Sequence, residues 1–405
     1  MALFRCSSSC ASTTSRIHVV LHLALGLLLV WSELAGAAGF EPLIELPNFK
    51  RGARRARTMR AVSVVDHGAK GNGLNDDTEA FVQAWKLVCS SKVGATLKVP
   101  TENAYLLRPI TFGGPCKSKI VLSVMGTIIA PSDPDMWYRL HPRRWLYFHG
   151  IKDLEVRGEG VIDGSGQGWW ARSCKTNASN PCRSAPTAMT FHRMRRLTVR
   201  GLTIVNAQQM HIAFTDSYQV QVSSLKVIAP ERSPNTDGIH LSSCVSVAVE
   251  DSIISTGDDC VSIVGNSSSI LIKNMVCGPG HGISIGSLGQ NKANDQVQDI
   301  LVDEAFVSTP KTVSGSKHGR NQTSAVKVEN VAFIDIKGTS ATEEAIKLAC
   351  SDSYPCKKIL LKNIELSSYS GGDAAAYCWK ASGFSSGEVT GYGCYIEVLK
   401  QVREN

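Results

Sequence analysis

A short strand pattern that recurs along the chain restricts the possible fold more than any other feature. After residue 100, helical periodicity is rare, and alternating apolar segments such as 220–222 and 270–272 are instead followed by Gly, Asn, Asp or Ser. Seven of these segments recur about every 23 to 31 residues, and several are followed by a second short strand. A repeat of this length, with strands and no helix, predicts a parallel β-helix whose stacked coils bury a continuous core. A propeller is the alternative, but the repeats are short for it and lack a blade signature.

The open end of such a stack needs a cover, because a bare terminal coil exposes unpaired backbone groups. Residues 76–85 are the candidate cover, with Asp76 or Asp77 as the helix N-cap, Glu79 placed to complete a capping box, and Trp85 on the apolar face. We therefore predict an all-β, single-domain parallel β-helix with an N-terminal capping helix.

The first 60 residues are predicted to lie outside this domain. Arg5 and Arg16 precede an apolar run over 19–31, and small residues follow it at 35–38. This layout predicts a secretory signal peptide over 1–38. A signal anchor is the alternative, although the run is shorter than the roughly 20 residues that span a bilayer.

Residues 39–60 are predicted to be a basic linker, and 61–405 the β-helix domain. The whole chain has a net charge of +8, but the first 60 residues contain eight basic and three acidic side chains. Most of the excess charge therefore lies outside the domain, and we expect no nucleic-acid partner. We expect a secreted, extracellular or cell-wall protein that is monomeric and has no membrane contact once the signal is removed.

The cysteine usage agrees with secretion. Eleven cysteines remain after the signal peptide, and in a secreted protein disulfides are favoured over metal ligands. The plausible local pairs are Cys89/Cys116, Cys174/Cys182, Cys260/Cys277, Cys350/Cys356 and Cys378/Cys394. Cys244 is then left as a buried free thiol. Glycosylation sequons begin at Asn177, Asn266 and Asn321.

Three carboxylates and one imidazole lie on three turn-like segments that are one repeat apart. They are Asp237 in Asn-Thr-Asp-Gly, Asp258 and Asp259 in Gly-Asp-Asp-Cys, and His281 in Gly-His-Gly. Strands pair about 4.8 Å apart, so equivalent turns on adjacent coils would form one row. Each segment alone is an ordinary turn, but their conjunction at this spacing predicts an active site.

Such a row suits the hydrolysis of a glycosidic bond. Three close carboxylates cannot all ionise cheaply, so one pKa should rise and that group can act as a general acid. The others can hold and deprotonate a water molecule. The flanking glycines would allow tight turns and close approach by a sugar. Calcium binding is the chemical alternative, and His281 argues against it.

At these residues the chain resembles the polygalacturonases, the pectin-cleaving enzymes of glycoside hydrolase family 28, in their plant secreted form. Segments 235–240, 257–260 and 280–289 match three of the four signature motifs of the family, and the likeness begins near Val65. The resemblance implies a right-handed parallel β-helix and inverting hydrolysis of α-1,4-galacturonosyl bonds in pectin, with no metal or organic cofactor. A pectate lyase is a weaker alternative, because nothing in the sequence suggests its calcium and arginine base.

The resemblance also implies roles for particular residues. Asp258 matches the general acid, Asp237 and Asp259 match the pair that activates water, and His281 matches the histidine beside the acid. Asn235 and Gly282 are the substrate-binding residues expected from the same motifs.

The fourth family motif, Arg-Ile-Lys, is missing. It should lie near 310–320, where its cations would hold the substrate carboxylate, but this stretch contains no such triplet. We predict a deletion of one to two coils between about Val307 and Gln322. An uncompensated sugar carboxylate is costly to bury, so a catalytically impaired or noncatalytic wall protein is the alternative to an active enzyme.

Overall fold

A computed structural model describes residues 44–49, 59–137, 140–289, 293–308, 326–372 and 374–389. The predicted signal peptide, most of the predicted linker and the predicted deletion point lie outside these residues. Within them, strands dominate and every strand pairing is parallel. No helix among the described residues is long and apolar enough to cross a membrane.

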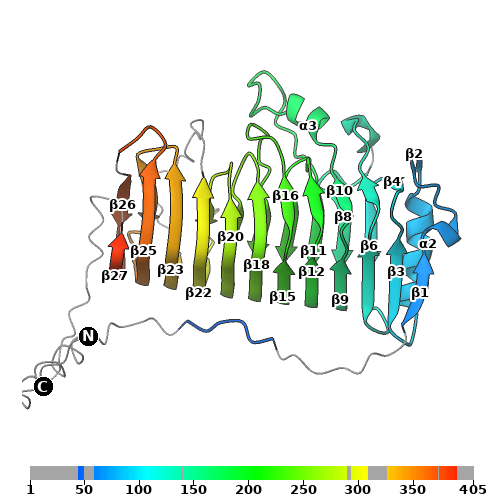
Figure 1. Cartoon of the computed structure of the whole chain (residues 1–405), viewed down its shortest axis with the longest axis horizontal. Coiled ribbons are helices and arrows are strands. Elements are labelled where there is room, and N and C mark those ends of the chain that lie inside the picture. Colours follow the sequence, from blue (N-terminus) through cyan, green and yellow to red (C-terminus); the bar gives the residue numbers. More distant parts are fainter. Residues whose placement is uncertain are drawn as a thin grey trace, which may run out of the picture. The chain divides into compact units, whose positions relative to one another are not determined.

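The strands form three ladders that run along the stack (Figure 1). The first ladder comprises β1 (Arg60–Ser63), β3 (Ala95–Val99), β6 (Ile120–Val124), β9 (Lys152–Arg157), β12 (Arg195–Arg200), β15 (Tyr218–Ser223), β18 (Val245–Ser255), β20 (Ser267–Cys277), β22 (Gln296–Ser308), β23 (Lys327–Ser340), β25 (Cys356–Ser368) and β27 (Ala381–Val389). The second comprises β2 (Asn72–Asp76), β4 (Ala104–Leu106), β7 (Thr127–Ile129), β10 (Val161–Asp163), β13 (Thr203–Val205) and β16 (Lys226–Ile228), which pairs with the second half of β18.

The third ladder carries the candidate site. It comprises β5 (Ile110–Gly113), β8 (Arg144–His149), β11 (Thr187–His192), β14 (Ile212–Thr215), β17 (Ile239–Ser242), β19 (Val261–Val264) and β21 (Ile283–Ile285). In the described chain this ladder ends at β21, because β24 (Glu344–Ala349) pairs only with β26 (Ala375–Trp379). The third side of the stack is therefore interrupted between β21 and β24.

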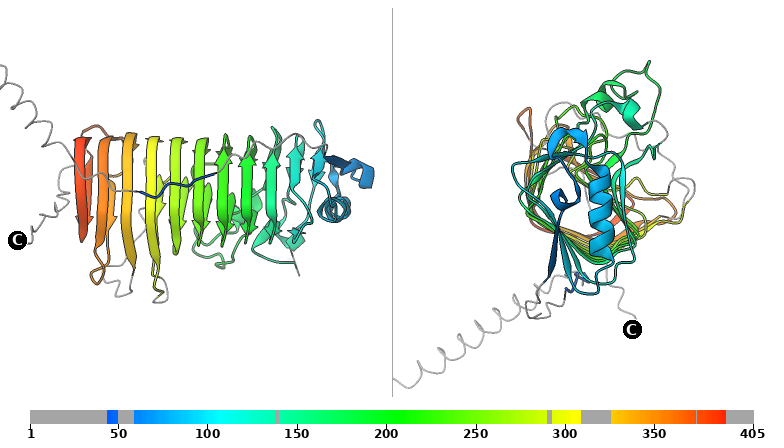
Figure 2. Two further views of the ribbon diagram at one scale, coloured as in Figure 1. Left: turned by 90° about the horizontal axis from the view of Figure 1, so that it is seen from below. Right: turned by 90° about the vertical axis from the view of Figure 1, so that its right-hand side faces the viewer.

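The repeat predicted from the sequence sets the register of the core. Val222, Val249 and Ile272 occupy one position of the first ladder, and all three are buried. The third ladder stacks phenylalanines in the same way, and the ring centroids of Phe148 and Phe191 lie 4.8 Å apart. Figure 2 shows the coils surrounding this shared interior. The core is thus continuous from coil to coil, as the repeat predicts.

Asparagine and aspartate make the sharp bends inside the long strands. Asp251 in β18 and Asn274 in β20 have φ of 51° and 50°, a left-handed conformation that these side chains tolerate better than most. The amide of Asn274 donates to the carboxylate of Asp251 at 2.7 Å. The polar residues that follow each apolar triplet therefore turn the coil and join it to its neighbour.

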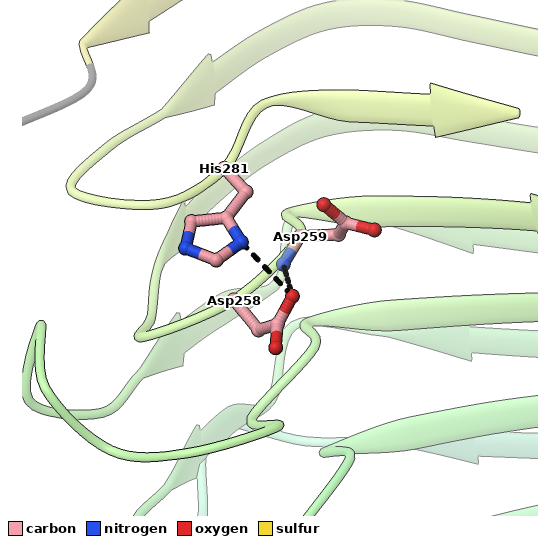
Figure 3. Close-up of side chains that lie close together, drawn as sticks. All are labelled: Asp258, Asp259 and His281. Carbon is pink, nitrogen blue, oxygen red and sulfur yellow. Dashed lines mark hydrogen bonds and ion pairs between the residues drawn. The ribbon is translucent and has the colours of Figure 1, made fainter. Parts of the chain in front are cut away.

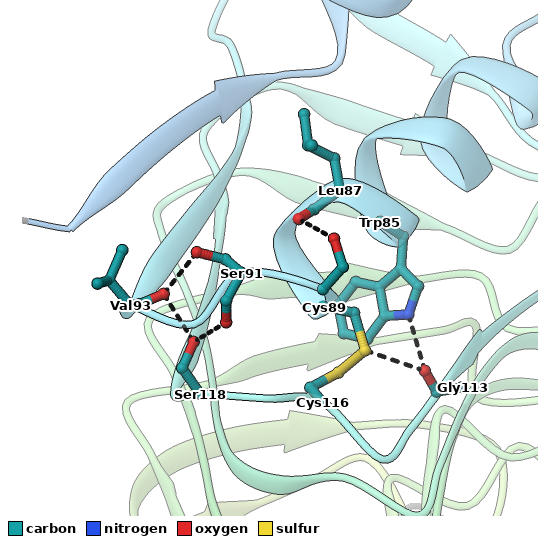
Figure 4. The surroundings of a disulfide bond; sticks show 9 residues. Trp85, Leu87, Cys89, Ser91, Val93, Gly113, Cys116 and Ser118 are labelled. Carbon is teal, nitrogen blue, oxygen red and sulfur yellow. Dashed lines mark hydrogen bonds between the residues drawn. A yellow bond between two sulfur atoms is a disulfide. The ribbon is translucent and has the colours of Figure 1, made fainter.

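The predicted capping helix is present as α2 (Thr78–Cys89), which stands at the β1 end of the stack. Phe81 and Trp85 are buried, and the indole of Trp85 donates to the carbonyl of Gly113 at 3.0 Å. The disulfide between Cys89 and Cys116 ties the end of the helix to the coils (Figure 4).

The predicted capping box is wrong in its contacts. Asp77 is at the N-cap position, but its carboxylate accepts hydrogen bonds from the backbone N–H groups of Lys70 and Gly71 instead. Asp76 accepts from the N–H of Thr78, and Glu79 accepts from Gln83. The preceding loop competes for the acceptor, which local spacing does not reveal.

Four of the five predicted disulfides are confirmed, at Cys89/Cys116, Cys174/Cys182, Cys260/Cys277 and Cys350/Cys356. Cys378 is also disulfide-bonded, and its predicted partner, Cys394, lies outside the described residues. Cys244 is a buried free thiol, as predicted. The remaining helical turns are η1 (Val65–His67), η2 (Pro134–Trp137) and α3 (Gln167–Ala171).

Removing the cap disulfide should destabilise the fold. The bond closes a loop with a sequence separation of 27, and restricting a loop of that size in the unfolded chain is worth about 3 kcal/mol. We expect a Cys89→Ala/Cys116→Ala variant to unfold at a lower denaturant concentration than the intact chain. Cys174→Ala/Cys182→Ala, which opens a loop with a separation of only 8, is the matched control and should cost less. An equal or larger loss in the control would contradict this account of the cap.

Candidate active site

The predicted site residues come from the turns that lead into three adjacent strands of the third ladder. Asp237 precedes β17, Asp258 and Asp259 precede β19, and His281 precedes β21. The N–H of Gly238 donates to the carbonyl of Asp259 at 2.8 Å, which fixes the two acidic turns against each other. The structure thus brings the predicted residues onto neighbouring coils at one edge of the ladder.

Asp258 is the centre of the cluster (Figure 3). Its Oδ1 lies 3.1 Å from Nδ1 of His281 and accepts the N–H of Asp259 at 2.9 Å. Its other oxygen, Oδ2, lies 3.4 Å from the amide nitrogen of Asn235. The side chain of Asp258 is 21% exposed. A partly exposed carboxyl group is therefore held in place from two sides while it remains open to a ligand.

The glycines of the motifs are needed for contact between coils. A Cβ on Gly257 would lie 2.1 Å from the carbonyl oxygen of Ser233, and one on Gly280 would lie 2.9 Å from Sγ of Cys260. Both distances are too short for any side chain. We expected these glycines to admit a sugar, but their main effect is to let adjacent turns approach each other.

Asp237 is 7% exposed and is embedded in a polar network. Its Oδ2 accepts a hydrogen bond from the hydroxyl of Ser262 at 2.8 Å, and that hydroxyl also lies 2.8 Å from Nδ1 of His240. Its backbone carbonyl lies 3.1 Å from Nδ1 of His211, a fully buried imidazole. On the next coil, Ser284 donates to Asp259 at 2.6 Å. Each of the two carboxylates is thus oriented by a serine from the following coil.

These supporting residues were not predicted from the sequence. A signal for them exists, since His240, Ser262 and Ser284 each stand three positions after Asp237, Asp259 and His281 respectively. That offset places them on the outer face of the three strands, where the polar side chains meet the acids of the preceding coil.

Burial and charge keep one carboxyl group protonated near neutrality. Burial, followed by repulsion from Asp258 and Asp259, raises the pKa of Asp237 to about 7. The hydrogen bond to Asp258 is the main reason that the pKa of His281 is raised above its usual value. Burial lowers the pKa of His211 to about 4, so this histidine is neutral and serves to hold the backbone. The free protein therefore carries its shared proton on Asp237, beside a His281–Asp258 ion pair.

Replacing Ser262 with alanine should raise the pKa of Asp237 further above about 7, because the hydroxyl stabilises the ionised carboxylate. The carboxyl titration can be followed by NMR. Ser284→Ala is the matched control, since it removes the equivalent bond from Asp259 and should not raise the pKa of Asp237. An unchanged titration in Ser262→Ala would contradict the assignment.

Asp258, Asp259 and His281 also meet a geometric condition for metal binding, with one ligand atom from each within 4.8 Å of the others. The donor set does not fit the calcium alternative, because calcium takes six to eight oxygen ligands and one of these donors is an imidazole. Oδ1 of Asp258 is already used by the ring of His281 and by the backbone of Asp259.

Two hollows flank the cluster. One, of about 250 Å³, lies at the interrupted third side and is lined by Gly282, Phe333 and Ile346 among others. The other, of about 760 Å³, lies toward the earlier coils and is lined by Asn235, Gln208 and Trp169 among others. The two predicted substrate-binding residues, Asn235 and Gly282, are thus placed in different hollows.

Comparison with known proteins identifies the family. The family model described as glycosyl hydrolases family 28 matches residues 89–314 and 312–387. A probable polygalacturonase of Arabidopsis thaliana is 48% identical over 404 residues, which cover 90% of this chain and 91% of the relative. A polygalacturonase of Persea americana is 41% identical, covering 86% of this chain and 83% of the relative. The chain belongs to glycosyl hydrolase family 28, and within that family it is similar to plant polygalacturonases.

Solved structures agree on the fold. An endo-xylogalacturonan hydrolase of Aspergillus tubingensis superposes with a TM-score of 0.62 at 22% identity, covering 82% of this chain and all of the other. An exopolygalacturonase of Thermotoga maritima gives a TM-score of 0.60 at 19% identity, covering 80% of this chain and 89% of the other. The predicted fold, a right-handed parallel β-helix, is confirmed.

Proposed function

We propose that this chain hydrolyses the α-1,4-galacturonosyl bonds of pectin by inversion. The observation that carries the proposal is the row of three carboxylates with one imidazole on adjacent coils, in a member of family 28. Water attacks the anomeric carbon, the bond to the glycosidic oxygen breaks, and that oxygen takes a proton from a carboxylic acid.

Asp258 is the proposed acid because it is the exposed member of the cluster and can reach a ligand. Asp237 and Asp259, each oriented by a serine, are proposed to hold and deprotonate the water. The proton of the free protein rests on Asp237, so donation from Asp258 requires the proton to move within the cluster when substrate binds. Three interacting carboxyl groups titrate as a set, which permits this shift. The raised pKa of His281 makes its imidazolium available beside Asp258 to favour it.

The proposed setting is the plant cell wall, reached by secretion through the predicted signal peptide. The proposed partner is polygalacturonate itself, bound by a monomer whose chemistry uses side chains alone, without a metal or organic cofactor. Asn235, which contacts the proposed acid, is the proposed substrate-binding residue on the side of the earlier coils. Gly282 is the corresponding residue on the side of the later coils.

The interrupted third ladder favours a second candidate, a family member that binds pectin without cleaving it. The two stretches of the family match meet at residues 312–314, within the range where the sequence predicts lost coils. No strand of the described chain continues the ladder beyond β21, so the cations expected there have no described counterpart.

The release of reducing ends from polygalacturonate by the purified chain, residues 39–405, separates the two candidates. We expect release from polygalacturonate and none from a neutral α-glucan, because a uronate polymer is the proposed substrate. Binding of polygalacturonate without any release, by a protein that is folded by circular dichroism, would favour the noncatalytic candidate and overturn the proposed hydrolysis.

A further inference from the structure

The larger hollow beside Asn235 contains several polar atoms that lack partners. Gln208 is 1% exposed, and neither its amide oxygen nor its amide nitrogen has a hydrogen-bond partner among the described residues. The indole nitrogens of Trp137 and Trp169 are also buried and unpaired in the described chain. All three side chains line the same hollow. Buried polar groups are nearly always paired in native proteins, so this concentration indicates a place where a polar ligand completes the bonding.

The rim of the hollow is positively charged. Arg143, Lys175 and Arg183 line it, and none of them has an ion-pair partner in the part of the chain that the structure describes. Arg172, by contrast, lines the same hollow and is paired with Asp133 and Asp135. An unpaired arginine presents a planar set of donors that matches a carboxylate. The charge and the orphaned donors together suit an acidic sugar.

The position of the hollow connects it to the chemistry. Asn235 lines the hollow, and its amide nitrogen lies 3.4 Å from Oδ2 of Asp258. The walls are formed by η2, by α3 with the disulfide-closed loop after it, and by residues 208–209 after β13. In Figure 1, α3 and its loop stand beyond the strand ends of the middle coils. Its volume of about 760 Å³ is within the range of small-molecule sites.

We propose that this hollow is a binding subsite for a galacturonosyl unit of the polymer, on the earlier-coil side of Asp258. The carboxylate of the unit is bound by Arg143 and Arg183, and its hydroxyls pair with Gln208 and the two indoles. The subsite rests on the proposed function for the identity of its ligand. It supplies cations on the side opposite the interrupted ladder, where the family motif is missing.

Calorimetric binding of an α-1,4-linked galacturonate hexamer to the full chain carrying Asp258→Asn tests the subsite. We expect Arg143→Gln to weaken binding roughly tenfold, since a charge-assisted bond to the carboxylate is lost. Arg195→Gln, on the exposed face of β12, removes the same charge away from the hollow and should leave affinity nearly unchanged. The fully methyl-esterified hexamer should bind the Arg143→Gln protein as well as it binds its parent. Equal losses in the two arginine variants would overturn the proposal, because they would indicate a general charge effect.

Gln208→Leu gives a second readout. It removes an unpaired buried amide from a site of similar volume, so the free protein should melt at the same temperature or higher while hexamer binding weakens roughly tenfold. Unchanged affinity would show that water, or the fold alone, is what Gln208 serves, and would overturn the subsite. Because binding is measured without turnover, pocket-dependent binding by a protein that cannot cleave would sustain the subsite and refute only the proposed hydrolysis. Normal cleavage with binding insensitive to Arg143 and Gln208 would do the reverse.

Discussion

Replacing Asp258 with asparagine should lower kcat on polygalacturonate by about 10²- to 10⁴-fold, the usual contribution of a general acid. Asparagine keeps the shape of the side chain and can still contact His281, but it has no proton to give the departing oxygen. KM should change little, because the substitution removes an interaction that matters in the transition state. The measurement is the initial rate of reducing-end release at saturating polymer.

Asp66→Asn is the matched control for that experiment, since it makes the same substitution at an exposed residue of η1 and should leave kcat unchanged. If Asp258→Asn retains full activity while Asp237→Asn is inactive, then proton donation belongs to Asp237, the residue that holds the proton in the free protein. That outcome would contradict the role proposed for Asp258.

Replacing Asp237 with asparagine should stabilise the fold in a pH-dependent way. The pKa of Asp237 is raised from 3.8 to about 7, so the folded protein holds this proton more tightly than the unfolded chain does. Wild-type stability is therefore lost progressively as the pH rises through that interval. The shift corresponds to about 4 kcal/mol when complete, so the Asn variant should gain up to that amount at pH 8 and little at pH 4.

Denaturant unfolding of both proteins at pH 4, 6 and 8 measures this difference. Comparison with the variant is needed because His211, with its lowered pKa, makes the protein lose stability as the pH falls from 6.5 toward about 4. That contribution is common to wild type and variant and cancels in the difference. A constant difference across the three pH values would show that Asp237 does not titrate as described. Asp66→Asn again serves as the control with no expected pH-dependent gain.

The fold was accessible from the sequence because a solenoid repeats its instructions. Segments such as 247–249 and 270–272 recur at the coil period, and the register of their side chains follows directly. The capping contacts were not accessible, because the N–H groups of Lys70 and Gly71 compete for Asp77 from a preceding loop. Such competition depends on three-dimensional approach, which local spacing does not contain.

The site was accessible only in part, for a related reason. The motifs identified Asp237, Asp258, Asp259 and His281, and one-repeat spacing predicted that they would lie on adjacent coils. The serines that orient the acids act between coils, so the sequence offers only an offset of three positions as a signal. The subsite around Gln208 depends on loops that converge from 134–143, 167–185 and 208–209, and no repeat places these together.

The central claim is that this chain breaks galacturonosyl bonds by adding water. Cleavage of polygalacturonate in H₂¹⁸O by the purified chain, followed by mass spectrometry of the products, tests it most directly. We predict one ¹⁸O atom at each newly formed reducing end, which first appears as the inverted anomer in proton NMR. Unsaturated products without ¹⁸O at the new ends, or no products from a folded protein, would contradict the claim.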